Sequence, residues 1–183
     1  LSVLTGFARK RREFQQHGRR PFKRILDKQA LDLPAGAGML GEHRSKQILA
    51  RYGIPVAKEA LLQPGDIETL KTAPLAFPVA VKVESPDVPH KTEAGAVRLD
   101  VRDLPGLKQA AREVLAAAMK FKPGARIEGV LVARQLSGGV ECILGIHRDP
   151  VFGPVAMFGL GGIFVEIMQD VVLHRCPFDE ATA

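Results

Sequence analysis

The stretch FPVAVKVESPDVPHKTEAGAVRLDV, residues 77–101, decides the fold and carries most of the candidate chemistry. Its first part, 77–85, is apolar and rich in β-branched residues, which predicts a buried strand. Its last part, 96–101, alternates apolar and polar residues, as a half-exposed strand does. A loop of Pro, Ser, Thr, His, Lys and Gly separates the two parts. We therefore expect two strands joined by a polar loop, within a domain that mixes helices and strands.

Lys82 lies among the apolar residues of the first of these strands. A lysine there is costly to bury unless its ammonium group meets an anion at the sheet surface. One interpretation is a lysine that binds phosphate. The other is a lysine at a strand edge whose long side chain reaches water. The strand pattern by itself favours neither interpretation.

The loop over residues 85–95 contains His90 and offers hydroxyl and backbone N–H groups of the kind that bind phosphate oxygens. An exposed hairpin loop without a binding role is the common alternative for a polar segment. Histidine is readily neutral near pH 7, so His90 is a candidate nucleophile or phosphoryl acceptor. A lone loop histidine is also often incidental.

Before residue 129, the remaining sequence alternates between helical and extended patterns. Residues 42–52 have the apolar spacing of a helix and are followed by Gly53, a residue typical of a helix C-cap. Further elements are expected as a strand at 55–61, a helix at 66–72, and a helix at 103–119 with Asp103 as its N-cap.

After residue 128 the sequence predicts strands alone. Four apolar segments follow within about 40 residues, at 129–135, 139–147, 154–159 and 163–167. Strands this close in sequence are joined by short turns, which predicts a mainly antiparallel sheet. The expected fold class is therefore α/β, of the α+β kind.

Two features in this second half are candidate ligand contacts. Glu141 lies on an otherwise apolar strand, where Mg²⁺, a ribose hydroxyl or a lysine would each serve as a partner, and a solvent-facing carboxylate is the alternative. Gly161 and Gly162 allow positive φ and close approach, and the apolar segment after them reaches Glu166. Neither GxGxxG before a helix nor GxxxxGK[ST] is present, so nucleotide binding would need another fold.

Charge is distributed unevenly along the 183 residues, whose 46% apolar content is typical of a folded protein. The formal net charge is +6, from 26 basic and 20 acidic residues. Eight of the basic residues but one acid fall in residues 1–24, which leaves 18 basic against 19 acidic residues for the rest. Residues 1–38 are therefore predicted to be a basic helical arm and linker, and 39–183 a nearly neutral domain.

Several classes of protein are disfavoured. The sequence has no apolar run near the roughly 20 residues of a membrane-spanning helix, and its N-terminus does not resemble a secretory signal. Cys142 and Cys176 are isolated, which argues against a disulfide framework and favours the cytoplasm. Because the chain starts at Leu1 and stops without an obvious terminal element, we expect a fragment of a longer protein.

Two segments carry a family resemblance: FPVAVKVESPDVPHKTEAGAVRL and GVLVARQLSGGVECILGIHRDPVFGPVAMFGLGGIFVEIMQDV. They resemble the ATP-grasp region of ADP-forming acetyl-CoA synthetases, the NDP-forming acyl-CoA synthetases related to succinyl-CoA synthetase. The similarity covers residues 39–180, and residues 1–38 resemble more weakly the connection that precedes this region in fused enzymes. It implies an ATP-grasp fold that is incomplete at its C-terminus and preceded by the basic arm.

The resemblance implies an acid–thiol ligase that interconverts acyl-CoA, ADP and phosphate with free acid, CoA and ATP. An acyl phosphate forms, a histidine of a CoA-binding part accepts the phosphoryl group, and the group passes to ADP with Mg²⁺. By resemblance, Lys82 binds nucleotide phosphates, His90 relays the phosphoryl group, Glu166 orients the phosphohistidine, and Glu141 contacts ribose or the metal site. The other implied cofactor contacts are Val130, Val132, Arg134, Gln135, Gly161 and Gly162, the first four as an adenine-side hinge formed by the backbone of 130–135.

The sequence also departs from the family pattern. Ala96 stands where the family commonly has glycine, and alanine resists a positive φ. The family's acidic Mg²⁺ motif lies beyond residue 183, and the CoA-binding domain is not in this chain, so we expect the chain alone to be inactive. The implied partners are a CoA-binding domain or subunit, a small acid or acyl-CoA, and further copies or subunits in an oligomer, with no membrane.

Two other functions stay open at this point. One is a degenerate ATP-grasp domain that regulates a protein acetyltransferase. The other is a binding module whose basic arm docks on nucleic acid or an anionic surface. Nucleic acid is disfavoured, because the arm has no known binding motif and its aromatic residues are Phe7, Phe14 and Phe22 alone. Packing of the arm on a neighbouring domain is favoured instead.

Overall fold

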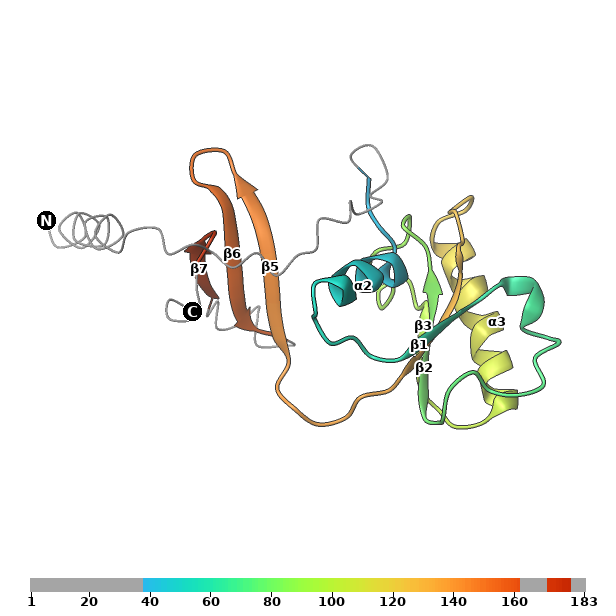
Figure 1. The fold of residues 1–183 in the computed structure, drawn as a ribbon. Helices are drawn as coiled ribbons and strands as arrows, with labels where there is room; N and C mark the ends of the chain where they lie inside the picture. The colour runs from blue at the N-terminus through green and yellow to red at the C-terminus, as the bar shows by residue number, and fades with distance from the viewer. Residues whose placement is uncertain (1–37, 162–170, 179–183) are drawn as a thin grey trace, which may run out of the picture. The chain divides into compact units, whose positions relative to one another are not determined.

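The computed structural model describes residues 38–161 and 171–178 (Figure 1). These residues belong to two compact units, which divide between Ser137 and Gly138. Each unit is described here by itself. The predicted arm, the predicted strand at 163–167, Gly162 and Glu166 lie outside the described residues.

The first unit contains a four-stranded antiparallel sheet in the order β1-β4-β2-β3. The strands are β1 (Glu59–Leu62), β2 (Val79–Glu84), β3 (Val97–Val101) and β4 (Gly129–Arg134). The predictions of β2, β3 and β4 are confirmed, and β1 begins four residues later than the predicted strand at 55–61. Because β2 and β4 are the two inner strands, their backbone groups pair on both sides.

Helix α3 (Leu104–Phe121) packs on this sheet (Figure 1). Asp103 caps it as predicted, because its Oδ1 accepts a hydrogen bond from the N–H of Gly106 at 2.7 Å. The buried face of the helix includes Leu107 and Val114, both 0% exposed. These side chains pack against the valines of β2 and β4, so the core lies between α3 and the sheet.

Helix α2 (Glu42–Arg51) is followed by the predicted capping glycine, Gly53, whose φ is +77°. The N–H of Gly53 bonds the carbonyl of Ala50, and the N–H of Ile54 bonds that of Leu49. This pair of bonds is the Schellman motif, which requires a left-handed residue at the position of Gly53.

The helix predicted at 66–72 is wrong. The structure has a 3-10 turn, η1 (Pro64–Asp66), followed by further turns. Ile67 is 2% exposed and belongs to the core, where Leu70 packs against it. A short segment gains little from helical hydrogen bonds because a helix is costly to nucleate, so burial of these two side chains decides its conformation.

The second unit contains a three-stranded antiparallel sheet in the order β5-β6-β7. Its strands are β5 (Cys142–Asp149), β6 (Gly153–Leu160) and β7 (Val171–Arg175). Asp149 fixes the turn between β5 and β6, since its Oδ1 accepts from the N–H groups of Val151 and Phe152. The predicted antiparallel pairing is confirmed, but β4 belongs to the sheet of the first unit and not to this one.

No helix in the described parts of the chain is both long and apolar enough to cross a membrane.

Candidate functional site

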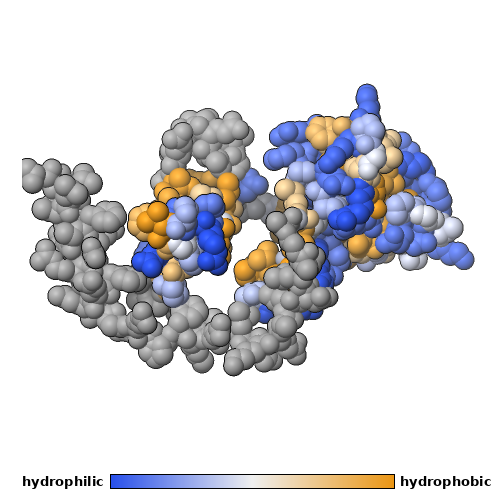
Figure 2. Space-filling model, turned by 90° about the horizontal axis from the view of Figure 1, so that it is seen from above, coloured by the Kyte–Doolittle hydropathy of each residue, from blue (hydrophilic) through white to orange (hydrophobic). Residues whose placement is uncertain are grey.

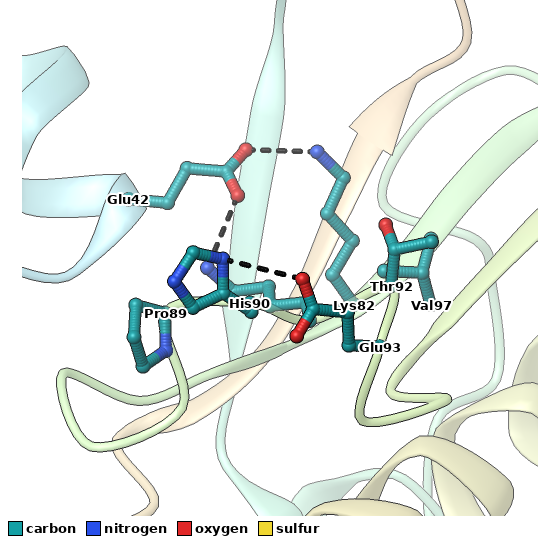
Figure 3. A pocket seen from close by; sticks show the side chains of 8 residues that line it. Glu42, Lys82, Pro89, His90, Thr92, Glu93 and Val97 are labelled. Atoms are coloured by element: carbon teal, nitrogen blue, oxygen red, sulfur yellow. Dashed lines mark hydrogen bonds and ion pairs between the residues drawn. The ribbon is translucent and has the colours of Figure 1, made fainter. Parts of the chain in front are cut away.

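A hollow of about 390 Å³ opens in the first unit where α2, β2 and the loop between β2 and β3 meet (Figure 3). It brings together two of the predicted site residues, Lys82 and His90. The full lining is Glu42, Lys82, Pro89, His90, Lys91, Thr92, Glu93 and Val97.

Lys82 reaches the hollow from the middle of an inner strand. Its neighbours Val81 and Val83 are 0% exposed, whereas the Lys82 side chain is 25% exposed. Its Nζ lies 2.9 Å from Oε1 of Glu42, and a dashed line marks this contact in Figure 3. Because β2 has a partner strand on each side, the strand-edge interpretation of this lysine does not hold. The ammonium group instead meets an anion above the sheet, which is the requirement set out from the sequence.

Glu42 stands in the first turn of α2 and is surrounded by lysines. Its Oε1 accepts from Nζ of Lys46 at 2.7 Å, and its Oε2 lies 3.3 Å from Nζ of Lys91. Burial by itself raises the pKa of Glu42, but the hydrogen bonds and charges of Lys46 and Lys82 outweigh it and lower the pKa to about 2. The carboxylate is therefore ionised across the physiological range.

The loop that carries His90 is held firmly at its base. Asp87 accepts at its Oδ2 from the N–H of Arg126 at 2.8 Å, and Val88 is 0% exposed. The N–H of Ala96 bonds the carbonyl of Lys91 at 2.8 Å. The side chain of Ala96 is fully buried, and the residue is not among those with positive φ. Alanine is thus tolerated where the family has glycine.

His90 itself points away from the core and is open to solvent. Its side chain is 72% exposed, and its Nδ1 lies 3.8 Å from Oε1 of Glu93 (Figure 3). At this distance the two groups are close enough for an ion pair but too far apart for a hydrogen bond. His90 is thus accessible to a solute in the hollow, and its chemical role stays a prediction.

A second carboxylate lies against the start of α2 and is not part of the hollow lining. Glu84 is 0% exposed, and its Oε1 accepts from the N–H of His43 at 2.8 Å. Its Oε2 has no hydrogen-bond partner among the described residues, and burial raises the pKa of this carboxyl group. A Cβ at Gly41 would collide with Oε1 of Glu84, so the start of α2 needs glycine at this close approach.

The predicted adenine-side residues do not enter the hollow. Val130 and Val132 are 0% exposed in the core under α3, on a strand paired on both sides, so neither offers an open group. The N–H of Arg134 bonds the carbonyl of Lys58 at 2.9 Å, and Oε1 of Gln135 accepts from the N–H of Asp100 at 2.6 Å.

Glu141 and Gly161 belong to the second unit. Glu141 is exposed, and its carbonyl accepts from the N–H of Gly161 at 2.7 Å. A Cβ at Gly161 would lie 3.1 Å from the backbone of Glu141, so the glycine permits this close approach.

Glu42 and Glu93 line the hollow but were not predicted from the sequence. The segment GEHRSK did contain a signal, because an acid in a first helical turn with a lysine four residues later is an ion-paired arrangement. Within residues 38–161 and 171–178, no group of three or more His, Cys, Asp and Glu side chains is placed to hold a metal ion.

Comparison with known proteins gives a consistent set of relatives. A family model described as "ATP-grasp domain" matches residues 32–183. The β subunit of acetate–CoA ligase [ADP-forming] II from Pyrococcus furiosus is 43% identical over 152 residues, which cover 82% of this chain and 64% of that protein. This chain therefore spans less than two thirds of that relative's length.

Solved structures agree with this match. Acetyl-coenzyme A synthetase 1 from Ca. Korarchaeum cryptofilum, in complex with coenzyme A and Ca-AMPCP, has a TM-score of 0.72 and 38% identity, covering 80% of this chain and 64% of that one. Another structure of it, with coenzyme A and Mg-AMPPCP and its phosphohistidine segment pointing towards the nucleotide binding site, has a TM-score of 0.58 at 35% identity. That match covers 76% of this chain and 58% of the other.

Proposed function

The chain belongs to the ATP-grasp domain family, and from that premise we propose that it is the nucleotide-binding part of an ADP-forming acyl-CoA synthetase. The enzyme would be an acid–thiol ligase that moves a phosphoryl group between an acyl phosphate and ADP by way of phosphohistidine. The relative from Pyrococcus furiosus is an acetate–CoA ligase [ADP-forming], and it supports this assignment.

The observation that carries the proposal is the position of Lys82. Its ammonium group reaches a hollow that Lys91, Thr92 and His90 also line, so two cations and a hydroxyl group face one space. These are the groups that neutralise and orient nucleotide phosphates, and phosphoryl transfer depends mainly on such positioning.

His90 is assigned the relay of the phosphoryl group. In the first step a bond forms between a ring nitrogen of His90 and phosphorus, as the nitrogen–phosphorus bond of the phosphohistidine on the CoA-binding part breaks. In the second step the terminal phosphate oxygen of ADP bonds to phosphorus as the His90 nitrogen–phosphorus bond breaks, which frees the imidazole. The exposure of His90 and the carboxylate of Glu93 beside its Nδ1 suit this role. The lysines of the same hollow would balance the negative charge of the transferred group.

Mg²⁺ and CoA are assigned to other parts of the enzyme. Within the described residues no three His, Cys, Asp or Glu side chains are grouped to hold a metal ion, and the proposal assigns no Mg²⁺ ligand among them. CoA and the acyl group would be bound by a separate domain or subunit, and the P. furiosus relative is itself named a β subunit. When bound with the nucleotide, Mg²⁺ would neutralise phosphate charge alongside Lys82.

The test is titration calorimetry of the full-length protein with Mg·ADP. A Lys82→Met variant removes the ammonium group and keeps an unbranched side chain, and we expect its affinity to fall by about tenfold or more. Lys108→Met is the matched control, because Lys108 lies on α3 and bonds the carbonyl of Glu68 far from the hollow lining. Absence of nucleotide binding by the unaltered protein would overturn the proposed function.

A further inference from the structure

Glu42 joins three lysines that come from three different segments of the chain. Lys46 belongs to α2 itself, Lys82 to β2, and Lys91 to the loop after β2. Their Nζ atoms lie 2.7, 2.9 and 3.3 Å from the Glu42 carboxylate oxygens. One carboxylate thus links the helix, the sheet and the loop around the hollow (Figure 3).

The Glu42 carboxylate is also held by Lys46, which is not part of the hollow lining. Nζ of Lys46 also bonds Oε2 of Glu59 on β1 at 2.7 Å, and Oε1 of Glu59 pairs with Nδ1 of His43 at 2.7 Å. The Glu59 side chain is 8% exposed, so this anchor is well shielded from water. Lys46 therefore ties Glu42 to Glu59 through contacts that involve neither Lys82 nor Lys91.

Lys82 and Lys91 depend on Glu42 in turn. Among the contacts of the described residues, Glu42 is the one carboxylate that pairs with either of them. Two ammonium groups in a hollow repel each other, and long lysine side chains lose much conformational entropy when they are held still. A fixed carboxylate between them offsets both costs.

We propose that Glu42 is a positioning residue, which holds the charged ends of Lys82 and Lys91 in the arrangement that nucleotide phosphates require. The inference rests on the proposed function, since it takes the hollow to be the phosphate site. Simple electrostatics predicts the opposite result, because loss of a negative charge beside an anion site should tighten binding. The preorganisation of two cations is the larger effect in this proposal.

The experiment is calorimetric titration of the full-length protein with Mg·ADP after Glu42→Gln, which keeps the shape of the side chain and removes its charge. We expect affinity to fall by about tenfold, as for loss of a charge-assisted contact. Glu68→Gln is the matched control, because Glu68 forms an exposed pair with Arg112 away from the hollow. Unchanged or tighter binding by Glu42→Gln overturns the proposal.

A double-variant cycle separates positioning from a merely structural effect. Because Glu42 acts through the lysines, its substitution should cost less in a Lys91→Met background than in the unaltered protein. Fully additive losses would show that Glu42 does not act through Lys91 and would overturn the proposal.

A further substitution, Glu42→Asp, covers the case in which Glu42→Gln does not fold. It keeps the charge with a shorter reach, and we expect an affinity between those of the unaltered protein and of variants that lose a lysine. Affinity equal to that of the unaltered protein contradicts the proposal. If the unaltered protein binds no Mg·ADP, the proposed function fails first, which is a distinct result.

Discussion

The two units differ in how far their apolar strand residues are buried. In the first unit, α3 covers a sheet whose core valines are 0% exposed. In the second unit, Leu144, Phe158 and Val172 face one another across the three strands and are 69%, 52% and 64% exposed. Figure 2 shows hydrophobic colour at the molecular surface. Strands with similar apolar sequences are thus core in one unit and surface in the other, so sequence pattern does not by itself decide burial.

The largest effect that should separate the units is the removal of a large side chain. Leu107→Ala empties part of the core under α3, and we expect a loss of about 2–5 kcal/mol in the free energy of unfolding. Leu173 on β7 is 65% exposed, so Leu173→Ala should cost well under about 1 kcal/mol. Urea unfolding of both variants checks the difference, and equal losses would break the contrast between the units.

A smaller effect concerns close backbone packing. Gly41→Ala places a Cβ against the Glu84 carboxylate, and the Glu84 side chain is buried and cannot readily move aside. We expect a loss of about 1–3 kcal/mol in the free energy of unfolding. In the second unit, a Cβ at Gly145 meets the end of the flexible Met157 side chain at 3.5 Å, an ordinary contact. Thermal unfolding should therefore show Gly145→Ala close to the unaltered protein; a larger loss there than for Gly41→Ala contradicts this view.

The smallest effect concerns buried charge. Burial raises the pKa of Glu84 above its ordinary value, so ionisation of this group opposes folding at neutral pH. Glu84→Gln should therefore stabilise the first unit at pH 7 by about 1 kcal/mol or less, and the gain should vanish as the pH falls below 4.5 and Glu84 becomes protonated. The measurement is unfolding free energy against pH.

Glu141→Gln is the control for this charge effect in the second unit, because Glu141 is exposed. It should change stability little at any pH. A gain from Glu84→Gln that is the same at pH 7 and pH 4 would show that desolvation of the carboxylate is not its cause.

Much of the fold was predictable because it depends on local rules. The β2 strand, the Asp103 cap and the Gly53 C-cap each follow from residues within a few positions of one another. The predictions that were wrong concern contacts between residues far apart in the sequence. The segment 66–72 adopts turns because Ile67 packs into a core formed by distant residues. Likewise, β4 joins β1 and β2, and not the strands that follow it.

The residues of the candidate site also differ in whether local sequence was enough to predict them. Lys82 and His90 were recognisable as residue types in a motif, whereas Glu42 is 40 positions from Lys82 and was found only through its contacts. Val130 and Val132, which the resemblance implies as cofactor contacts, have their side chains in the core, and their contact with a nucleotide stays a prediction.

By itself, the sequence determined the strand carrying Lys82, the polar loop carrying His90, the caps of the helices and the family to which these motifs belong. Only the tertiary structure decided which strands share a sheet, which apolar faces are covered, and which carboxylate meets the lysines of the hollow. The physical reason is the sequence separation over which each interaction acts. Backbone periodicity and capping act between neighbouring residues, whereas burial and ion pairing act between segments whose meeting depends on the whole chain.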